Sequence, residues 1–149
     1  MNSRASVSAG FQLEKPRAFL LWGIDEAALV NELERFGLRR VTDGYYTIAC
    51  TSLGGLKHML GFHFEPRTSG KLARLEFFRT QYDDLKASFA EFQRHLTGAF
   101  GEPTEVGPIS CGVPTYRWVI DTVVIVHSLF ERFGPEEQLY IGNSAFRKS

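Results

Sequence analysis

Two segments with helical periodicity are each followed by three segments with strand periodicity, and this repeated order constrains the fold more than any other feature. In the first helical segment, apolar side chains recur at Leu29, Leu33 and Phe36, a spacing that places them on one stripe of a helix. Asp25 supplies an N-cap carboxylate, and a glycine follows the stripe. The sequence therefore predicts a helix over residues 26–36.

The second helical segment begins near Tyr82 and carries a longer apolar stripe. Glycine and proline follow at Gly101 and Pro103, and they stop the helix because glycine favours a left-handed cap and proline cannot donate a backbone hydrogen bond. Each stripe must be buried against another layer, so both helices are expected to pack on a sheet. The residues of the second stripe are Leu85, Phe89, Phe92, Leu96 and Phe100.

Six segments are rich in strand-forming residues or alternate between apolar and polar side chains. They lie at 45–51, 58–65 and 72–79 after the first helix, and at 115–120, 122–130 and 138–142 after the second. Turn-forming residues at 66–70 connect two of them as a hairpin, and residues 102–112 are expected to form a loop. Each group of three segments is therefore predicted to be an antiparallel meander.

The two groups align when the chain is shifted by 64 residues. His63 then falls on His127, and both lie in a middle strand. The agreement of element order and register favours an internal duplication, with pseudo-repeats at 25–79 and 82–143.

The predicted fold class follows from this order. It is α+β, with duplicated αβββ units forming one mainly antiparallel sheet of about six strands and two helices packed on one face. Residues 13–149 are expected to form a single α+β domain, preceded by a flexible N-terminal arm at residues 1–12.

Charge and hydropathy argue against two classes of partner. The 17 basic and 17 acidic residues are spread evenly, without the basic stripe on which nucleic-acid binding relies. The longest apolar stretch, at 123–126, is far shorter than the ~20 residues that span a bilayer. Residues 1–10 lack the apolar core of a secretory signal. We therefore expect no nucleic-acid or membrane partner and a cytoplasmic location.

Motifs for common enzyme chemistry are missing, including nucleophile elbows, phosphate-binding loops and metal-ligand spacings. Cys50 and Cys111 have neither zinc nor redox spacing and are expected to be buried thiols, although the sequence leaves a disulfide between them open. His63 and His127 form a ligand or metal pair in one interpretation. In the other, which we favour, they are hydrogen-bonded surface or half-buried residues. No catalytic residue, metal or cofactor is predicted.

If the helices cover one face of the sheet, alternation assigns other side chains to the opposite face. The strand at 122–130 is apolar on both faces, and we expect Val124 and Val126 to point inward. Aliphatic side chains on an open face mark a contact surface, and aromatic side chains often anchor one. The candidate partner-binding residues are therefore His63, Arg74, Phe78, Tyr116, Trp118, Val123, Ile125, His127, Leu129 and Tyr140.

Two functional hypotheses follow from this surface. The preferred one is a non-enzymatic binding protein that uses the open face of the sheet against a protein partner or a second copy of itself, as a homodimer. The alternative is a small-molecule-binding domain or an unrecognised enzyme, with a pocket between the sheet and the 102–112 loop that uses His63, His127 and Arg74. A flat apolar patch favours the first hypothesis, and a concave pocket with converging polar groups favours the second.

Overall fold

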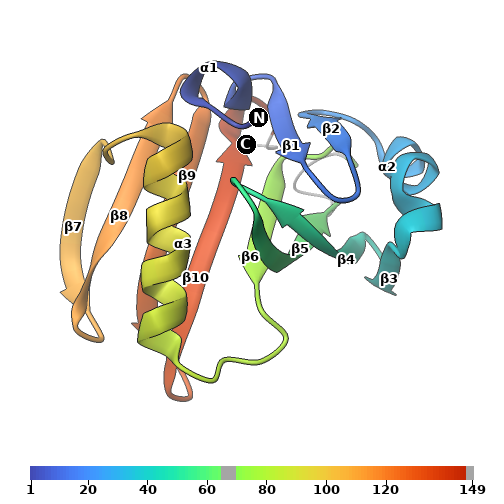
Figure 1. Ribbon diagram of the computed structural model, residues 1–149. Helices are drawn as coiled ribbons and strands as arrows, with labels where there is room; N and C mark the ends of the chain where they lie inside the picture. The colour runs from blue at the N-terminus through green and yellow to red at the C-terminus, as the bar shows by residue number, and fades with distance from the viewer. Residues whose placement is uncertain (65–69, 147–149) are drawn as a thin grey trace.

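Eight antiparallel strands form one sheet in the computed structural model of the chain, which describes residues 1–64 and 70–146 (Figure 1). In spatial order they are β3 (Arg39–Thr42), β4 (Tyr45–Ser52), β5 (Leu56–His63), β6 (Arg74–Phe78), β10 (Pro135–Asn143), β9 (Val123–Glu131), β8 (Val113–Ile120) and β7 (Glu105–Ser110). The predicted α+β class and mainly antiparallel pairing are confirmed. Most of the hairpin turn predicted at 66–70 lies outside the described residues.

The sheet has eight strands rather than about six because both of its edge strands escaped the sequence pattern. Strand β3 is exposed along its length and begins with two arginines, and β7 contains Gly107 and Pro108 beside a shift in register. An edge strand has one neighbour and little buried surface, so it lacks the alternation that identifies inner strands. The segment predicted as a loop at 102–112 is thus largely the edge strand β7.

The first helix is α2 (Glu26–Leu33), which continues as the 3-10 turn η1 (Glu34–Phe36). The carboxylate of Asp25 accepts a hydrogen bond from the backbone N–H of Ala28, as an N-cap does. Leu29 and Leu33 are buried as predicted, but Phe36 is 45% exposed. The tighter 3-10 turn rotates Phe36 off the stripe, because it has three residues per turn in place of 3.6.

The second helix is α3 (Leu85–Phe100), which begins three residues later than predicted because Asp84 is its N-cap. Phe89, Phe92, Leu96 and Phe100 of the predicted stripe are buried. The stripe packs on β9 and β10, and Phe89 lies flat on the ring of His127 at a centroid distance of 3.9 Å. Helix α3 therefore covers the half of the sheet built from the second half of the chain (Figure 1).

The N-terminal residues correct the prediction of a flexible arm at 1–12. They form the short helix α1 (Arg4–Val7), capped by Ser3, and β1 (Gly10–Leu13), which pairs with β2 (Ala18–Leu21) in a second, two-stranded sheet. Phe11 is fully buried and packs edge-on against Phe77 of β6. This small sheet therefore packs over β4 to β6, beside α3.

All of these elements lie on one face of the eight-stranded sheet (Figure 1). Glu26 of α2 contacts Tyr46, and the residues paired with Tyr46 across the neighbouring strands end at Ile141. Helix α3 contacts His127, which lies on the same face in the next row of paired residues. A single hydrophobic core lies between the layers. The last element, the 3-10 turn η3 (Ser144–Phe146), adds Phe146 to its edge. In the described residues, none of the three α-helices nor the two-stranded sheet covers the other face, which we call the open face.

The pairing of the two central strands, β6 and β10, can be compared with the predicted duplication. Strands β6 and β10 pair symmetrically about Glu76 and Tyr140, which are 64 positions apart in the chain. The flanking strands break this symmetry by one residue. Leu60 pairs with Phe77, and a shift of 64 places Leu60 on Val124, but Ile125 is the residue that pairs with Ile141. The duplication therefore stays a prediction.

Among the described residues, no helix has both the length and the apolar character needed to cross a membrane.

Candidate functional site

The open face presents side chains from β4 to β10 in rows that run across the strands. One row joins Glu76, Tyr140, Val126 and Arg117, which pair in that order from β6 to β8. These four side chains are neither fully buried nor fully exposed. Each row mixes aromatic, aliphatic and charged groups, so the face has no single chemical character.

At one side of this face, Tyr45, His63 and Glu76 form a hydrogen-bonded cluster. The hydroxyl of Tyr45 donates to Glu76 Oε1 at 3.3 Å, and His63 Nε2 lies 3.4 Å from Glu76 Oε2. The hydrogen bond from His63 lowers the pKa of Glu76 more than partial burial raises it. Burial and the neighbouring Glu76 carboxylate raise the pKa of Tyr45 to about 12. The cluster therefore holds an ionised Glu76 beside a neutral phenol.

Arg74 lies beside this cluster but makes a different contact. Its guanidinium carbon is 4.1 Å from the centre of the Tyr140 ring, a cation–π arrangement. Its Nε atom is buried and has no hydrogen-bond partner among the described residues. A buried donor without an acceptor is destabilising by about 1–3 kcal/mol, and more when the group is charged. Arg74 is therefore a charged group with unused hydrogen-bonding capacity.

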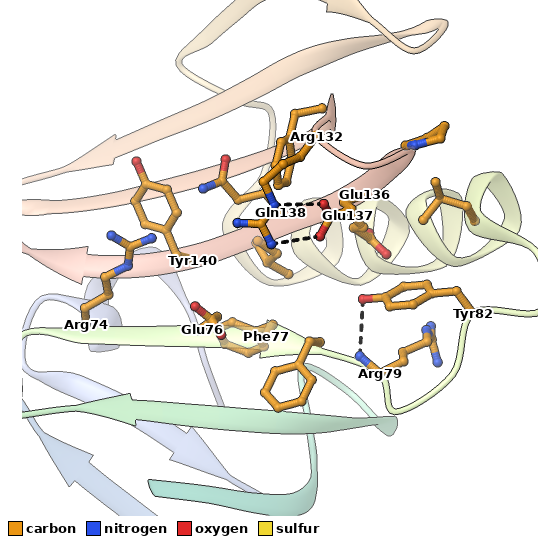
Figure 2. Close-up of a pocket in the computed structure, with 15 residues that line it drawn as sticks. Arg74, Glu76, Phe77, Arg79, Tyr82, Arg132, Glu136, Glu137, Gln138 and Tyr140 are labelled. Atoms are coloured by element: carbon orange, nitrogen blue, oxygen red, sulfur yellow. Dashed lines mark hydrogen bonds and ion pairs between the residues drawn. The ribbon is translucent and has the colours of Figure 1, made fainter. Parts of the chain in front are cut away.

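A pocket opens where β6 and β10 separate, beyond the last pair, Phe77 and Leu139 (Figure 2). We call it the β6–β10 pocket, and its volume is about 590 Å³. Tyr82 borders it from the segment before α3, and its oxygen accepts a hydrogen bond from the backbone of Arg79. The pocket is lined by Arg74, Glu76, Phe77, Phe78, Arg79, Tyr82, Leu85, Phe130, Arg132 and residues Pro135 to Tyr140.

Glu137 connects this pocket to a polar network beneath the sheet. Its Oε2 lies 2.6 Å from His127 Nε2, and both side chains are at most 1% exposed. Ser88 of α3 donates to Glu137 Oε1 at 2.7 Å and accepts from Arg79 Nε at 2.7 Å. Arg79 also forms an ion pair with Glu91. A polar network, buried at His127 and Glu137 and partly exposed at Arg79 and Glu91, therefore ties α3 to β9 and β10.

Burial lowers the pKa of His127, and the hydrogen bond and charge of Glu137 oppose that effect. His127 Nδ1 lies 2.8 Å from Gln93 Oε1, so both ring nitrogens have partners. The imidazole is closed off between Phe89, Gln93 and Glu137, and a substrate has no access to it. Its role in this position is to join the layers.

A second histidine cluster lies under β4 and β5. The Nδ1 atom of His58 is 2.9 Å from the Met59 carbonyl, which makes it the donor and leaves Nε2 to accept from the Ser52 hydroxyl at 2.6 Å. This is the hydrogen-bond pattern of a serine nucleophile and its base, but the Ser52 side chain is fully buried. The Cys50 sulfur lies 3.8 Å from His58 Nε2.

The protonation states of this cluster argue against nucleophilic chemistry. Burial lowers the pKa of His58 to about 4 and raises the pKa of Cys50 to about 12. The thiol therefore stays protonated and the imidazole stays neutral at pH 7, whereas an activated cysteine needs a lowered pKa. Cys50 and Cys111 are both free, so they do not form a disulfide.

Buried His58 predicts a loss of stability at acidic pH. Its pKa is 6.5 in an unfolded reference and about 4 in the fold, so the unfolded chain binds more protons between these values. The stability is present above pH 6.5 and falls as the pH drops toward 4, by roughly 3 kcal/mol from this residue. Urea unfolding at pH 7 and pH 4 measures this difference, which should shrink in His58→Asn. An unchanged difference in the variant would contradict the assignment.

The structure divides the predicted binding residues between two faces. His63, Arg74, Phe78 and Tyr140 lie on the open face, on β5, β6 and β10, as the alternation predicted. The other six lie on the face that α3 covers, which corrects the prediction. They are Tyr116, Trp118, Val123, Ile125, His127 and Leu129. Binding roles for the first group stay a prediction.

The error arose in β9, where both faces are apolar. Because neither face of this strand is polar, the alternation separates its side chains into two sets but does not show which set is buried. Equating His127 with His63 selected the wrong phase, because β9 is shifted by one residue relative to β5 and a one-residue shift reverses every side chain. Val124 and Val126 consequently face outward. His63 and His127 lie on opposite faces of the sheet and do not form a pair.

Sequence reasoning missed Glu137 and the pocket beside it. Gly134 and Pro135 are typical of a turn, whereas β10 begins at Pro135 and carries the Glu137 side chain into the core. The available signal was a histidine on an apolar strand, since a buried imidazole needs a polar partner. In the described residues, no three His, Cys, Asp or Glu side chains are grouped as they would be around a metal ion.

The sequence matches no known family model, and neither the curated proteins nor the solved structures give a significant match to this chain.

Proposed function

We propose that this chain is a non-enzymatic binding protein that uses the open face of its sheet to contact a protein partner, either a different protein or a second copy. One observation carries the proposal. The face that α3 and the two-stranded sheet leave uncovered has apolar side chains at its centre, among them Phe78, Val124, Val126 and Tyr140. Apolar patches rimmed by polar groups mark contact sites.

The composition of this face supports a protein partner. Tyrosine and arginine are enriched among the residues that contribute most to protein interfaces. Tyr140, Arg74 and Arg117 lie within two adjacent rows of the sheet. The surrounding rows add His63 and Phe78.

The edges of the sheet are less suited to a partner than its face. Pairing of a partner strand requires a regular edge with free backbone groups. Strand β7 is interrupted by Pro108, which has no N–H, and by its shift in register. Strand β3 is four residues long and begins with Arg39 and Arg40. Charges, proline and irregularity are the features that protect edges from strand addition.

The alternative pocket between the sheet and residues 102–112 does not fit the fold. These residues largely form β7, which lies in the plane of the sheet rather than over it. His127, which that pocket was to use, is fully buried under α3. The face-binding hypothesis therefore accounts better for the geometry, with Val124 and Val126 replacing Val123 and Ile125 in it.

We expect a photo-crosslinking amino acid at Val126 to trap the partner in living cells. Ala90 is the control position. Its side chain is exposed to solvent on α3, which lies on the opposite side of the sheet from the open face. Adducts should form from position 126 but not from position 90, and Tyr140→Ala should reduce them. Mass spectrometry of the adduct distinguishes a second copy from a different protein. Equal adducts from both positions, or none from position 126, contradict the proposal.

Two further properties belong to this proposal. The symmetric pairing of Glu76 with Tyr140 supports an origin of the two halves by duplication. The free thiols of Cys50 and Cys111 support a reducing compartment, and thus the cytoplasm, as the place of action.

A further inference from the structure

The β6–β10 pocket lies on the open face but differs from a flat protein contact in depth. Its volume of about 590 Å³ falls in the range of roughly 300–1,000 Å³ that holds small organic ligands. Phe78, Phe130 and Tyr140 supply aromatic surface to its walls. Polar groups fix the orientation of a ligand in such pockets, and six of the fifteen residues that line this one are arginine or glutamate.

Most of the charged groups in this pocket already have partners. Arg132 contacts both carboxylate oxygens of Glu136, at 3.2 and 3.4 Å. Glu137 accepts from Ser88 and contacts His127 beneath the sheet. These contacts satisfy the groups at the end of the pocket near the β9–β10 turn.

Near the centre of the sheet, the charged groups of Glu76 and Arg79 also have partners, but one nitrogen of Arg74 has none within the described part of the chain. Glu76 is held by Tyr45 and His63 on the side of β4 and β5. Arg79 is engaged by Ser88 and Glu91 on the side of α3. Arg74 alone has a buried nitrogen without a hydrogen-bond partner among the described residues.

We propose that the β6–β10 pocket binds a small organic molecule with one carboxylate on a flat apolar body, and that Arg74 anchors the carboxylate. A guanidinium and a carboxylate match as two parallel charge-assisted hydrogen bonds, so this ligand offers acceptors to the Arg74 guanidinium in the pocket wall, and its buried Nε gains one when the side chain turns toward the ligand. The Tyr140 ring under the guanidinium holds it in place and offers a surface for the apolar body.

A single negative charge fits this pocket better than two. Arg74, Arg79 and Arg132 face Glu76, Glu136 and Glu137, so the lining charges balance. A dianion such as a phosphate monoester would bring two negative charges next to three carboxylates, and the three guanidinium groups already balance those carboxylates. A monoanion adds one charge beside one underused cation.

The ligand class is tested with three matched probes on the isolated chain: 3-phenylpropionate, its neutral amide, and phenyl phosphate. Titration calorimetry and NMR shifts of the Arg74 Nε–H group measure binding. We expect saturable binding of the carboxylate, and about tenfold weaker binding of the amide, because each lost charge-assisted contact costs a factor of this order. Phenyl phosphate should bind more weakly than the carboxylate. An amide that binds as well as the acid, or a carboxylate that does not bind, overturns the proposal.

Variants locate the site. Arg74→Gln should weaken 3-phenylpropionate about tenfold or more, and Arg74→Lys should recover part of the loss because it keeps the charge without the planar fork. Arg132→Gln is the matched control, since its guanidinium lines the same pocket but is already paired with Glu136. Equal losses in Arg74→Gln and Arg132→Gln contradict the assignment. If Arg74→Gln does not fold, Arg74→Lys takes its place in the comparison with Arg132→Gln.

This inference goes beyond the proposed protein contact, and the two fail separately. The probe titration needs no partner, so it tests the pocket even if no adduct forms at Val126. Adducts from position 126 together with no carboxylate binding retain the interface and reject the ligand site.

Discussion

Ile125→Lys is expected to unfold this chain, whereas Val126→Lys is expected to leave it folded. Ile125 is fully buried between β9 and the layer that contains α3, and Val126 lies on the open face. The first substitution loses about 1.5–3 kcal/mol of apolar burial and places an ammonium in the core, where the penalty is several kcal/mol more. Typical domains have only about 5–15 kcal/mol of stability in total. The loss therefore approaches or exceeds the whole free energy of unfolding.

Val126→Lys changes the adjacent residue and the opposite face, so it is a closely matched control. Its ammonium reaches solvent, and we expect a change of about 1 kcal/mol or less. Far-UV circular dichroism in urea, together with the fluorescence of buried Trp118, reports both variants. If Ile125→Lys folds with little loss while Val126→Lys unfolds, the assignment of faces is reversed. Val126→Lys also removes an apolar group from the proposed interface, so it should abolish partner adducts from a crosslinking amino acid placed at Val124 instead, without loss of fold.

Glu137→Leu is expected to destabilise the fold by about 3–5 kcal/mol, because it leaves His127 and Ser88 buried without their acceptor. Removing one member of a buried pair leaves the other uncompensated in a medium of low dielectric constant. Glu136→Leu, one position away, removes an exposed pair with Arg132 and should change stability by about 1 kcal/mol or less. The free energy of unfolding in urea measures both.

The double variant His127→Leu/Glu137→Leu separates the pair from its surroundings. A buried pair that is replaced by apolar side chains of similar size often costs little, so the double variant should be more stable than the sum of its single variants predicts. A coupling of at least about 1 kcal/mol is expected from groups in direct contact. If the single losses add without coupling, the 2.6 Å contact between His127 and Glu137 does not contribute as an interaction.

Much of the candidate surface could be predicted from the sequence in strands whose side chains are apolar on one face and polar on the other. Residues 74–78 alternate between Leu75 and Phe77 on one side and Arg74, Glu76 and Phe78 on the other, and the structure places the first pair in the core. The register of β6 with β10 then brought Arg74 to Tyr140. The pocket beside them could not be predicted, because it depends on where two strands from distant parts of the chain stop pairing.

Local signals determined the helices by themselves. Asp25 caps α2 as its sequence context predicted, and the stripe from Phe89 to Phe100 is buried in α3. Capping and the 3.6-residue period act within a few residues, so they are legible without knowledge of the rest of the fold.

The tertiary structure alone decided what depends on residues far apart in the chain. It placed Val123 and Ile125 inside and Val124 and Val126 outside, because α3 buries one phase of a strand that is apolar on both. It also made β3 and β7 strands, since an edge takes its conformation from its neighbour rather than from its own pattern. The buried pairing of His127 with Glu137 was decided in the same way. A polar group enters a core only when packing brings it an acceptor, and no local sequence pattern records that event.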